Sequence, residues 1–348
     1  MRIHLGHHFY GAGNLGDDFM LAGFLTAMRT LAPGSTFTGS VPFPREPLQA
    51  RFPEVAWLPY ETAARADAIA ACDAWLGLGG SPFQHDQSRW FVDHLADEAR
   101  ACARHRTPMY YLGVGVQSAA ELDDAAVREL CRQAAAIWTR DQASTERLRQ
   151  LALPARIESA ADLAHVLFQH TPPPAAAAGR IALVANFDYR SWPGQDACLR
   201  ALTRLRAREH VWLAQESREL PGAERALHAS LPAAERARWT LHVPDEPGTP
   251  LAHALARWPG SEWLVTARYH AALAAAWAGS RTVIIATNEK LRGAAAELGL
   301  PSITPDASED EVWQALERAA AASPPRHFAA RALAACADFA RSAVAHAR

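Results

Sequence analysis

Short apolar segments alternate with amphipathic ones along the first half of the chain. Five apolar runs bounded by turn residues are typical of buried parallel strands: residues 2–9, 35–41, 74–80, 109–116 and 136–140. Between the first two runs, residues 18–31 repeat apolar positions at a helical spacing, with Leu21, Leu25 and Met28 on one face. The pattern predicts a sheet of parallel strands covered by helices.

The second half of the chain repeats this alternation. Strand-like runs at 180–187, 210–216, 239–243, 262–268 and 282–287 alternate with alanine-rich helical stretches. Between the halves, "HTPPPAAAAGR" at 170–180 has no apolar periodicity. We predict an α/β protein with two Rossmann-like, doubly wound domains. The N-terminal domain covers residues 1–170, the linker 171–180 and the C-terminal domain 181–348.

Ligands of open α/β sheets bind beyond the carboxyl ends of the strands. We therefore expect the functional residues on loops that follow strands and face a cleft between the two domains. Length agrees with two domains, because 348 residues exceed a single domain of about 150.

Composition excludes several classes of protein. Hydrophobic residues make up 49% and charged residues 21% of the chain, and no apolar run approaches the length of about 20 residues needed to span a membrane. A formal net charge of -2 without Lys/Arg blocks argues against nucleic-acid binding. We expect no transmembrane segment and no nucleic-acid partner.

The cysteines and histidines give no sign of a metal or disulfide framework. Five widely spaced cysteines contain no C-x-x-C pair, and His4 and His8 would share one strand face while His7 points away. The start "MRIHLGHHF" is too polar for a signal peptide. We expect a cytoplasmic protein with no metal and no cofactor, compatible with peripheral association at the inner membrane face.

The segment "GAGNLGDD" at 11–18 contains G-x-G-x-x-G after a predicted strand and before a predicted helix. Two features exclude a dinucleotide site. Asp17 and Asp18 would repel a pyrophosphate at the helix N-terminus, and no acidic residue lies between Asp18 and Glu46 to bind a ribose. The glycines instead predict a tight turn with Asn14 and Asp17 facing the cleft; alternatively, Asp17 only caps the helix.

Three further strand ends carry candidate chemistry. Gly79, Gly80 and Ser81 form a small turn whose backbone N–H groups suit an anion or a sugar ring. Arg268 and His270 follow the strand-like run 262–266, and Lys290 follows the next one. Arginine and lysine suit an anionic substrate, and histidine can deliver a proton near neutral pH. The alternatives are a salt bridge for Arg268, a core position for His270 and plain surface for Lys290.

Taken in order, these segments resemble the polysaccharide pyruvyl transferase family. The resemblance rests on "GAGNLGDD", the Gly-Gly-Ser turn, "LGVGV", "RDQAS", "ADLA", "ARYHAALAAAWAG" and "NEKLRGAAAELGLP", and extends from about residue 3 to about residue 305. Leu78 and Gln117 depart from the family pattern. The resemblance implies a fold similar to type B glycosyltransferases. It also implies transfer of a pyruvyl (ketal) or carboxyvinyl group from phosphoenolpyruvate to a sugar of a polysaccharide, glycolipid or glycan precursor, with phosphate released. The acceptor would be a saccharide or a lipid-linked saccharide.

On this hypothesis His270 is the general acid and Asp17 the general base. Arg268 and Lys290 hold the donor, and the resemblance suggests Arg190 as a further ligand of its carboxylate. The saccharide acceptor lies near Asn14, Gly80, Ser81 and Gln84. Among the eleven tryptophans, Trp192 in an "SWPG" loop is the one we expect to stack on a sugar.

Two alternatives remain open at this stage. A nucleotide-sugar glycosyltransferase of the same fold would need a carboxylate for the ribose, which Asp245 or Glu246 in "VPDEPGTP" would supply. A non-catalytic binding subunit would be favoured by an Arg268 and a His270 that are buried and satisfy each other.

Overall fold

The computed structural model describes residues 1–6, 8–42, 44–60, 62–84, 89–175, 177–186, 192–216, 223–246, 248–322 and 327–346. These residues form two compact units. Unit 1 comprises Met1–Ala12, Asp17–His170 and His327–Arg348, and unit 2 comprises Gly13–Gly16 and Thr171–Arg326. Each unit is a parallel sheet with interleaved helices, as the sequence pattern predicts.

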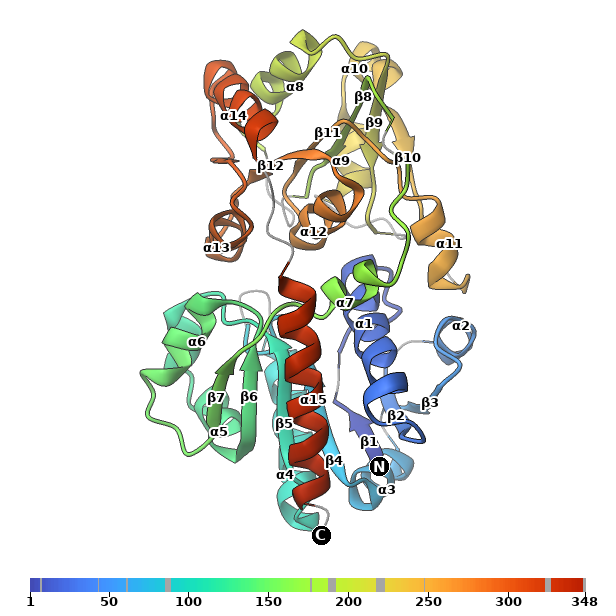
Figure 1. Cartoon of the computed structure of the whole chain (residues 1–348), viewed down its shortest axis with the longest axis vertical. Coiled ribbons are helices and arrows are strands. Elements are labelled where there is room, and N and C mark those ends of the chain that lie inside the picture. The colour runs from blue at the N-terminus through green and yellow to red at the C-terminus, as the bar shows by residue number, and fades with distance from the viewer. Residues whose placement is uncertain are drawn as a thin grey trace. The chain divides into compact units, whose positions relative to one another are not determined.

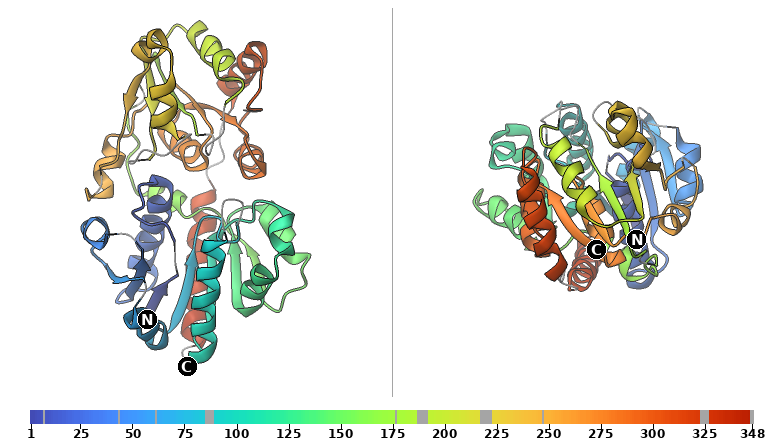
Figure 2. Two further views of the ribbon diagram at one scale, coloured as in Figure 1. Left: turned by 180° about the vertical axis from the view of Figure 1, so that it is seen from behind. Right: turned by 90° about the horizontal axis from the view of Figure 1, so that it is seen from above.

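Unit 1 is built on a seven-stranded sheet in the order β3-β2-β1-β4-β5-β6-β7. Its strands are β1 (Arg2–Leu5), β2 (Thr36–Val41), β3 (Val55–Pro59), β4 (Ala74–Leu78), β5 (Met109–Val114), β6 (Ala134–Thr139) and β7 (Arg156–Ser159). Its helices are α1 (Leu15–Leu31), α2 (Arg45–Arg51), α3 (Ala63–Ala71), α4 (Trp90–His105), α5 (Ala125–Gln133), α6 (Gln142–Arg149), α7 (Ala164–Gln169) and α15 (Phe328–His346), with a short 3₁₀ turn at Ala119–Asp123. Helices α15 and α4 cover opposite faces of the sheet (Figures 1 and 2).

Unit 2 has a six-stranded sheet in the order β10-β9-β8-β11-β12-β13. Its strands are β8 (Arg180–Val184), β9 (Glu209–Leu213), β10 (Thr240–His242), β11 (Trp263–Thr266), β12 (Arg281–Ile285) and β13 (Ser302–Ile303). Its helices are α8 (Gln195–Arg204), α9 (Glu224–Ser230), α10 (Ala233–Arg238), α11 (Leu251–Ala256), α12 (Tyr269–Ala278), α13 (Glu289–Leu298) and α14 (Glu309–Ala321). In both sheets the strand order reverses beside the first strand, at β1/β4 and at β8/β11, where doubly wound folds bind ligands.

The C-terminal helix α15 packs in unit 1, although residues 181–348 were predicted to form one domain. Phe339 is fully buried there, with its ring centroid 5.4 Å from that of Tyr110 on β5 and 6.2 Å from that of Trp138 on β6. The Trp138 Nε1–H donates to Asp338 over 3.1 Å. An apolar stripe on a terminal helix does not encode which sheet it covers, so the sequence pattern missed this return.

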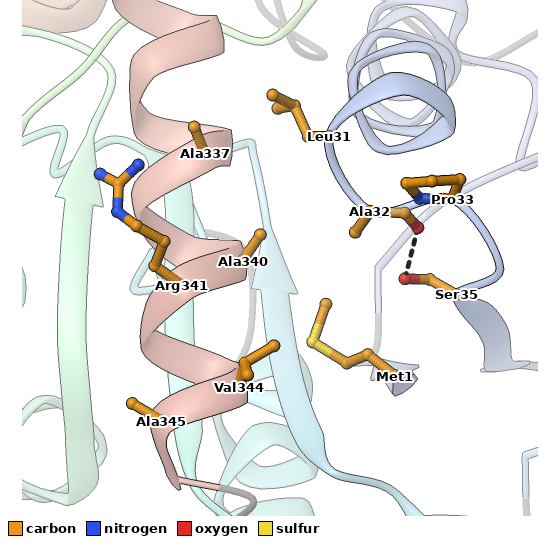
Figure 3. Close-up of a pocket in the computed structure, with 10 residues that line it drawn as sticks. All are labelled: Met1, Leu31, Ala32, Pro33, Ser35, Ala337, Ala340, Arg341, Val344 and Ala345. Carbon is orange, nitrogen blue, oxygen red and sulfur yellow. Dashed lines mark hydrogen bonds between the residues drawn. The ribbon is translucent and has the colours of Figure 1, made fainter.

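Unit 1 also contains an apolar groove of about 850 Å³, lined by α15, the end of α1 and Met1 (Figure 3). Met1 precedes β1 and Ser35 precedes β2, so the groove lies at the amino edge of the sheet. The candidate residues follow strands and belong to the carboxyl edge. The groove is therefore separate from them.

Candidate functional site

The loop between β1 and α1 is a tight turn built on glycines. Gly11 and Gly13 have φ values of +66° and +95°, a region that side chains disfavour. The Gly11 N–H donates to Asp18 Oδ1 over 2.9 Å, and the same buried carboxylate pairs with Arg51. Asp18 thus holds the turn closed, a structural role.

Asn14 caps helix α1, since its Oδ1 accepts a hydrogen bond from the Gly16 N–H over 3.1 Å. Asn14, rather than Asp17, therefore occupies the N-cap position of α1. Asp17 lies in the first turn, with Oδ1 3.9 Å from Nδ1 of the buried His8.

His8 stacks on Tyr10 at 4.8 Å between ring centroids, and the Tyr10 hydroxyl donates to the Leu78 carbonyl. Burial, with the charges of Asp17 and Asp18, raises the pKa of Tyr10 well above its usual value.

The turn after β4 contacts this cluster. Gly79 and Gly80 both have φ near +68°, so glycine is required at both positions. A Cβ on Gly80 would overlap Nε2 of His8. The small turn residues therefore let the loop approach the imidazole beside Asp17.

Ser81 is buried and accepts a hydrogen bond from Nη2 of Arg140 over 3.0 Å. Arg140 is also buried, with Nη1 3.9 Å from Asp162. Gln84 accepts from the side-chain amide of Gln117. Ser81 and Gln84 thus belong to polar networks within unit 1, and Arg140 is a partner that the sequence analysis missed although "RDQAS" contains it.

In unit 2, Arg268 is held by two carboxylates. Its Nε donates to Glu224 over 2.6 Å, and its Nη2 donates to both Glu216 and Glu224. Burial alone would lower the pKa of the Arg268 guanidinium, but Glu224 and Glu216 outweigh it and the pKa is raised. Burial raises the pKa of the fully buried Glu224 carboxyl, although Arg268 opposes the shift. Nε and Nη2 of Arg268 thus form the salt bridge that the alternative interpretation of this residue predicts.

The glycine loop meets the Arg-x-His motif within unit 2. Asn14 forms an isolated antiparallel bridge with Glu216, and the Leu15 N–H donates to the Gln215 carbonyl over 3.4 Å. A Cβ on Gly16 would overlap Nδ1 of His270, so the absence of a side chain there makes room for the imidazole. Segments more than 200 residues apart are thereby brought together around Glu216 and His270.

His270 is buried, with 6% of its surface exposed, and lies edge-on to Tyr269. The half-buried Lys290 places Nζ 5.4 Å from the centre of the Tyr269 ring. Arg268, His270 and Lys290 therefore share the ends of β11 and β12. Arg190 lies outside the described residues.

The remaining candidates lie elsewhere in unit 2. Trp192 is 7% exposed and belongs to the hydrophobic core, so the expectation that it stacks on a sugar is not met. Asp245 is buried, and the exposed Glu246 pairs with Arg257. Sequence analysis missed Glu216 and Glu224; a signal for Glu216 was present, because it ends the strand-like run 210–216.

Across the described ranges, no group of three or more His, Cys, Asp or Glu side chains is placed to hold a metal ion. Within the same ranges, no helix combines the length and apolarity that a membrane span requires.

Comparison with known proteins decides the family. The model of the polysaccharide pyruvyl transferase family matches residues 14–289, from the glycine loop to the start of α13. The chain belongs to the polysaccharide pyruvyl transferase family. It is thus a member of a transferase family, and the match includes residues 14–18 of the "GAGNLGDD" segment and the Arg-x-His motif. No curated protein sequence matches this family member.

Solved structures similar to this pyruvyl transferase family member bind or act on nucleotide sugars. The UDP-GlcNAc 2-epimerase of Neisseria meningitidis bound to UDP-GlcNAc is 10% identical, with a TM-score of 0.62 over 99% of this chain and 100% of that one. Anabaena HepE in complex with UDP-glucose is 12% identical, with a TM-score of 0.60 over 98% and 100%. The Rickettsia bellii UDP-N-acetylglucosamine 2-epimerase is 10% identical, with a TM-score of 0.60 over 99% and 95%. At these identities the likeness concerns the fold alone, two Rossmann-like domains as in type B glycosyltransferases.

Proposed function

We propose that this protein transfers a pyruvyl or carboxyvinyl group from phosphoenolpyruvate to a saccharide acceptor and releases phosphate, without a cofactor. The observation that carries the proposal is the contact of Gly16 with His270. Arg268 is tied to the same loop, because Glu216 accepts a hydrogen bond from Arg268 and forms a backbone bridge with Asn14. Family membership supplies the reaction class. The arrangement supplies a buried imidazole and a guanidinium of fixed orientation at the end of β11.

Arg268 supports the binding of an anionic donor even though it is ion-paired. Its Nε and Nη2 donate to the two glutamates, while Nη1 makes no hydrogen bond to the described residues. The glutamates therefore orient the planar guanidinium and leave Nη1 for the donor. Lys290 adds a second cation at the next strand end, and we retain Arg190 as a further donor ligand.

The proposed chemistry begins with proton transfer from His270 to the methylene carbon of phosphoenolpyruvate, which leaves an oxocarbenium-like centre at the neighbouring carbon. A sugar hydroxyl attacks that carbon while Asp17 accepts the hydroxyl proton. The carbon–oxygen bond to phosphate then breaks, and Arg268 and Lys290 stabilise the departing anion. Attack by a second hydroxyl, whose proton passes to the released phosphate, closes a ketal, whereas return of a methyl proton to the deprotonated His270 gives the carboxyvinyl ether.

Unit 1 would bind the acceptor in this proposal. The turn at Gly80 and Ser81 lies against His8, and His8 lies beside Asp17. Asn14 contributes by closing the helix start that precedes Asp17.

Thermal shift measurements test the donor. A ligand that binds only the folded state raises its stability by RT ln(1 + [L]/Kd), about 2.7 kcal/mol at a hundredfold excess over Kd. We expect phosphoenolpyruvate to raise the melting temperature, and UDP, GDP and CMP to leave it unchanged, with inorganic phosphate as the control anion.

A shift with UDP or GDP alone would contradict the proposal in favour of a nucleotide-sugar glycosyltransferase of the same fold. A shift with none of these ligands, together with no phosphate release in the presence of saccharides, would favour a non-catalytic subunit.

A further inference from the structure

An aromatic cluster lies at the carboxyl edge of the unit 1 sheet. Phe9 follows β1, Tyr60 follows β3, and Trp90 begins α4 after β4. Because these strands are parallel, their carboxyl ends meet at one edge. Three segments distant in sequence therefore bring aromatic rings to the edge that carries Asp17 and Gly80.

Trp90 is the most accessible ring of this cluster. It is 39% exposed, whereas every other tryptophan among the described residues is buried or half-buried. Its centroid lies 4.3 Å from that of His94, 5.9 Å from that of Phe9 and 6.4 Å from that of Tyr60. The described neighbours His94, Phe9 and Tyr60 hold the indole in place, so it offers a rigid apolar surface with little side-chain entropy to lose on binding.

The cluster is continuous with the proposed general base. Phe9 stacks on Phe91 at 5.3 Å between centroids, and Phe91 lies edge-on to His8 at 5.9 Å. His8 in turn lies 3.9 Å from Asp17. An unbroken series of ring contacts thus connects Trp90 with the carboxylate that accepts the hydroxyl proton in the proposed reaction.

Polar groups border the aromatic surface. The Arg65 guanidinium lies 4.3 Å from the centre of the Tyr60 ring. The His94 ring packs against Tyr60 and Trp90 with both of its nitrogens buried, so it supports the rings and does not face a ligand. Sugar rings have apolar C–H faces and hydroxyl rims, so they require an apolar surface with hydrogen-bonding groups at its margin. Here the exposed indole of Trp90 supplies the apolar surface and the partly exposed Arg65 supplies the polar group at its margin.

We propose that Trp90, supported by Phe9, Tyr60 and His94, forms a saccharide-binding platform that holds the acceptor sugar next to Asp17. This inference rests on the proposed function for the identity of Asp17 as the base, while the binding itself depends only on the platform. Trp90 thus takes the sugar-stacking role that the sequence pattern assigned to Trp192, which is buried in the core of unit 2.

Saturation-transfer NMR on the full chain without phosphoenolpyruvate tests the platform. The probes are the methyl glycosides of glucose, galactose, mannose and N-acetylglucosamine. We expect the wild type to bind at least one of them, and Trp90→Ala to weaken that binding at least about tenfold, the equivalent of about 1.4 kcal/mol. Trp90→Phe keeps an aromatic face and should remain within about threefold of the wild type.

Trp313→Ala is the matched control, because Trp313 is a half-buried tryptophan of unit 2 that contacts Arg204. It should bind the glycosides as the wild type does. Equal binding by wild type and Trp90→Ala, or binding of none of the four glycosides by the wild type, would overturn the platform.

The phosphoenolpyruvate thermal shift, measured on the same samples, separates this inference from the proposed function. A normal shift in Trp90→Ala with lost glycoside binding supports both. Trp90-dependent glycoside binding without any phosphoenolpyruvate shift in the wild type supports the platform and contradicts the donor. A phosphoenolpyruvate shift without glycoside binding contradicts the platform alone.

Discussion

At the scale of single residues, the chemistry depends on His270 and on the glycine that makes room for it. His270→Asn keeps a polar side chain but cannot deliver a proton at neutral pH. We expect turnover, measured as phosphate release, to fall by about 10²- to 10⁴-fold, the range for a lost general acid. The phosphoenolpyruvate thermal shift should persist, since donor binding is assigned to Arg268 and Lys290.

His253→Asn, at an exposed position of α11, is the matched control and should have wild-type turnover. Near wild-type phosphate release by His270→Asn would exclude the proposed acid. Loss of folding and activity together in that variant would assign His270 a structural role.

Arg268 combines a structural and a binding contribution that two substitutions separate. Arg268→Ala leaves the buried Glu224 without its cation, which we expect to lower stability by about 3–5 kcal/mol and to abolish the phosphoenolpyruvate shift. Arg268→Lys restores charge but not the planar fork, so it should recover most of the melting temperature and only part of the donor shift. Calorimetric melting with and without phosphoenolpyruvate measures both. A full donor shift in Arg268→Ala would remove Arg268 from the donor site.

At the scale of elements, β1 carries a buried histidine that makes unit 1 sensitive to acid. His4 is fully buried, with Nδ1 2.9 Å from the Thr38 hydroxyl on β2. Burial, aided by the positive charge of Arg65, lowers the pKa of His4 from 6.5 to about 3. Between these two pH values the unfolded chain binds a proton that the folded chain does not, so stability falls as the pH decreases.

The expected loss for this single group is about 1.4 kcal/mol per pH unit below pH 6.5. His4→Asn keeps a polar atom near Thr38 and removes the titrating ring, so its melting temperature should fall less than that of the wild type between pH 7 and pH 5. The same fall in both proteins would show that His4 is not responsible.

At the scale of the whole molecule, the C-terminal helix α15 stabilises the unit that begins the chain. Phe339→Ala removes a fully buried ring packed against Tyr110 and Trp138 and should cost about 3–5 kcal/mol. Hydrogen exchange should show lost protection in β4–β6, with β8–β12 unchanged. Val344→Ala, on the same helix but 43% exposed, should change neither the free energy of unfolding nor the hydrogen exchange of β4–β6. Lost protection confined to unit 2 would contradict the packing of α15 in unit 1.

The sequence by itself determined the class of the fold and the segments that carry candidate chemistry. Apolar residues at alternate positions or at a helical spacing indicate which face of a strand or helix is buried, and glycines after a strand indicate a tight turn. The Arg-x-His segment and "GAGNLGDD" were therefore recognisable as loops at strand ends, and together they indicated the family.

Only the tertiary structure decided which of these segments meet. Asn14 caps α1, Glu216 joins Arg268 to the glycine loop, and Gly16 accommodates His270. It also decided that Trp192 is core while Trp90 is exposed, and that α15 returns to unit 1. Periodicity describes an element's own faces, whereas a pairing across 200 residues depends on how whole sheets and helices pack, and no local spacing encodes that.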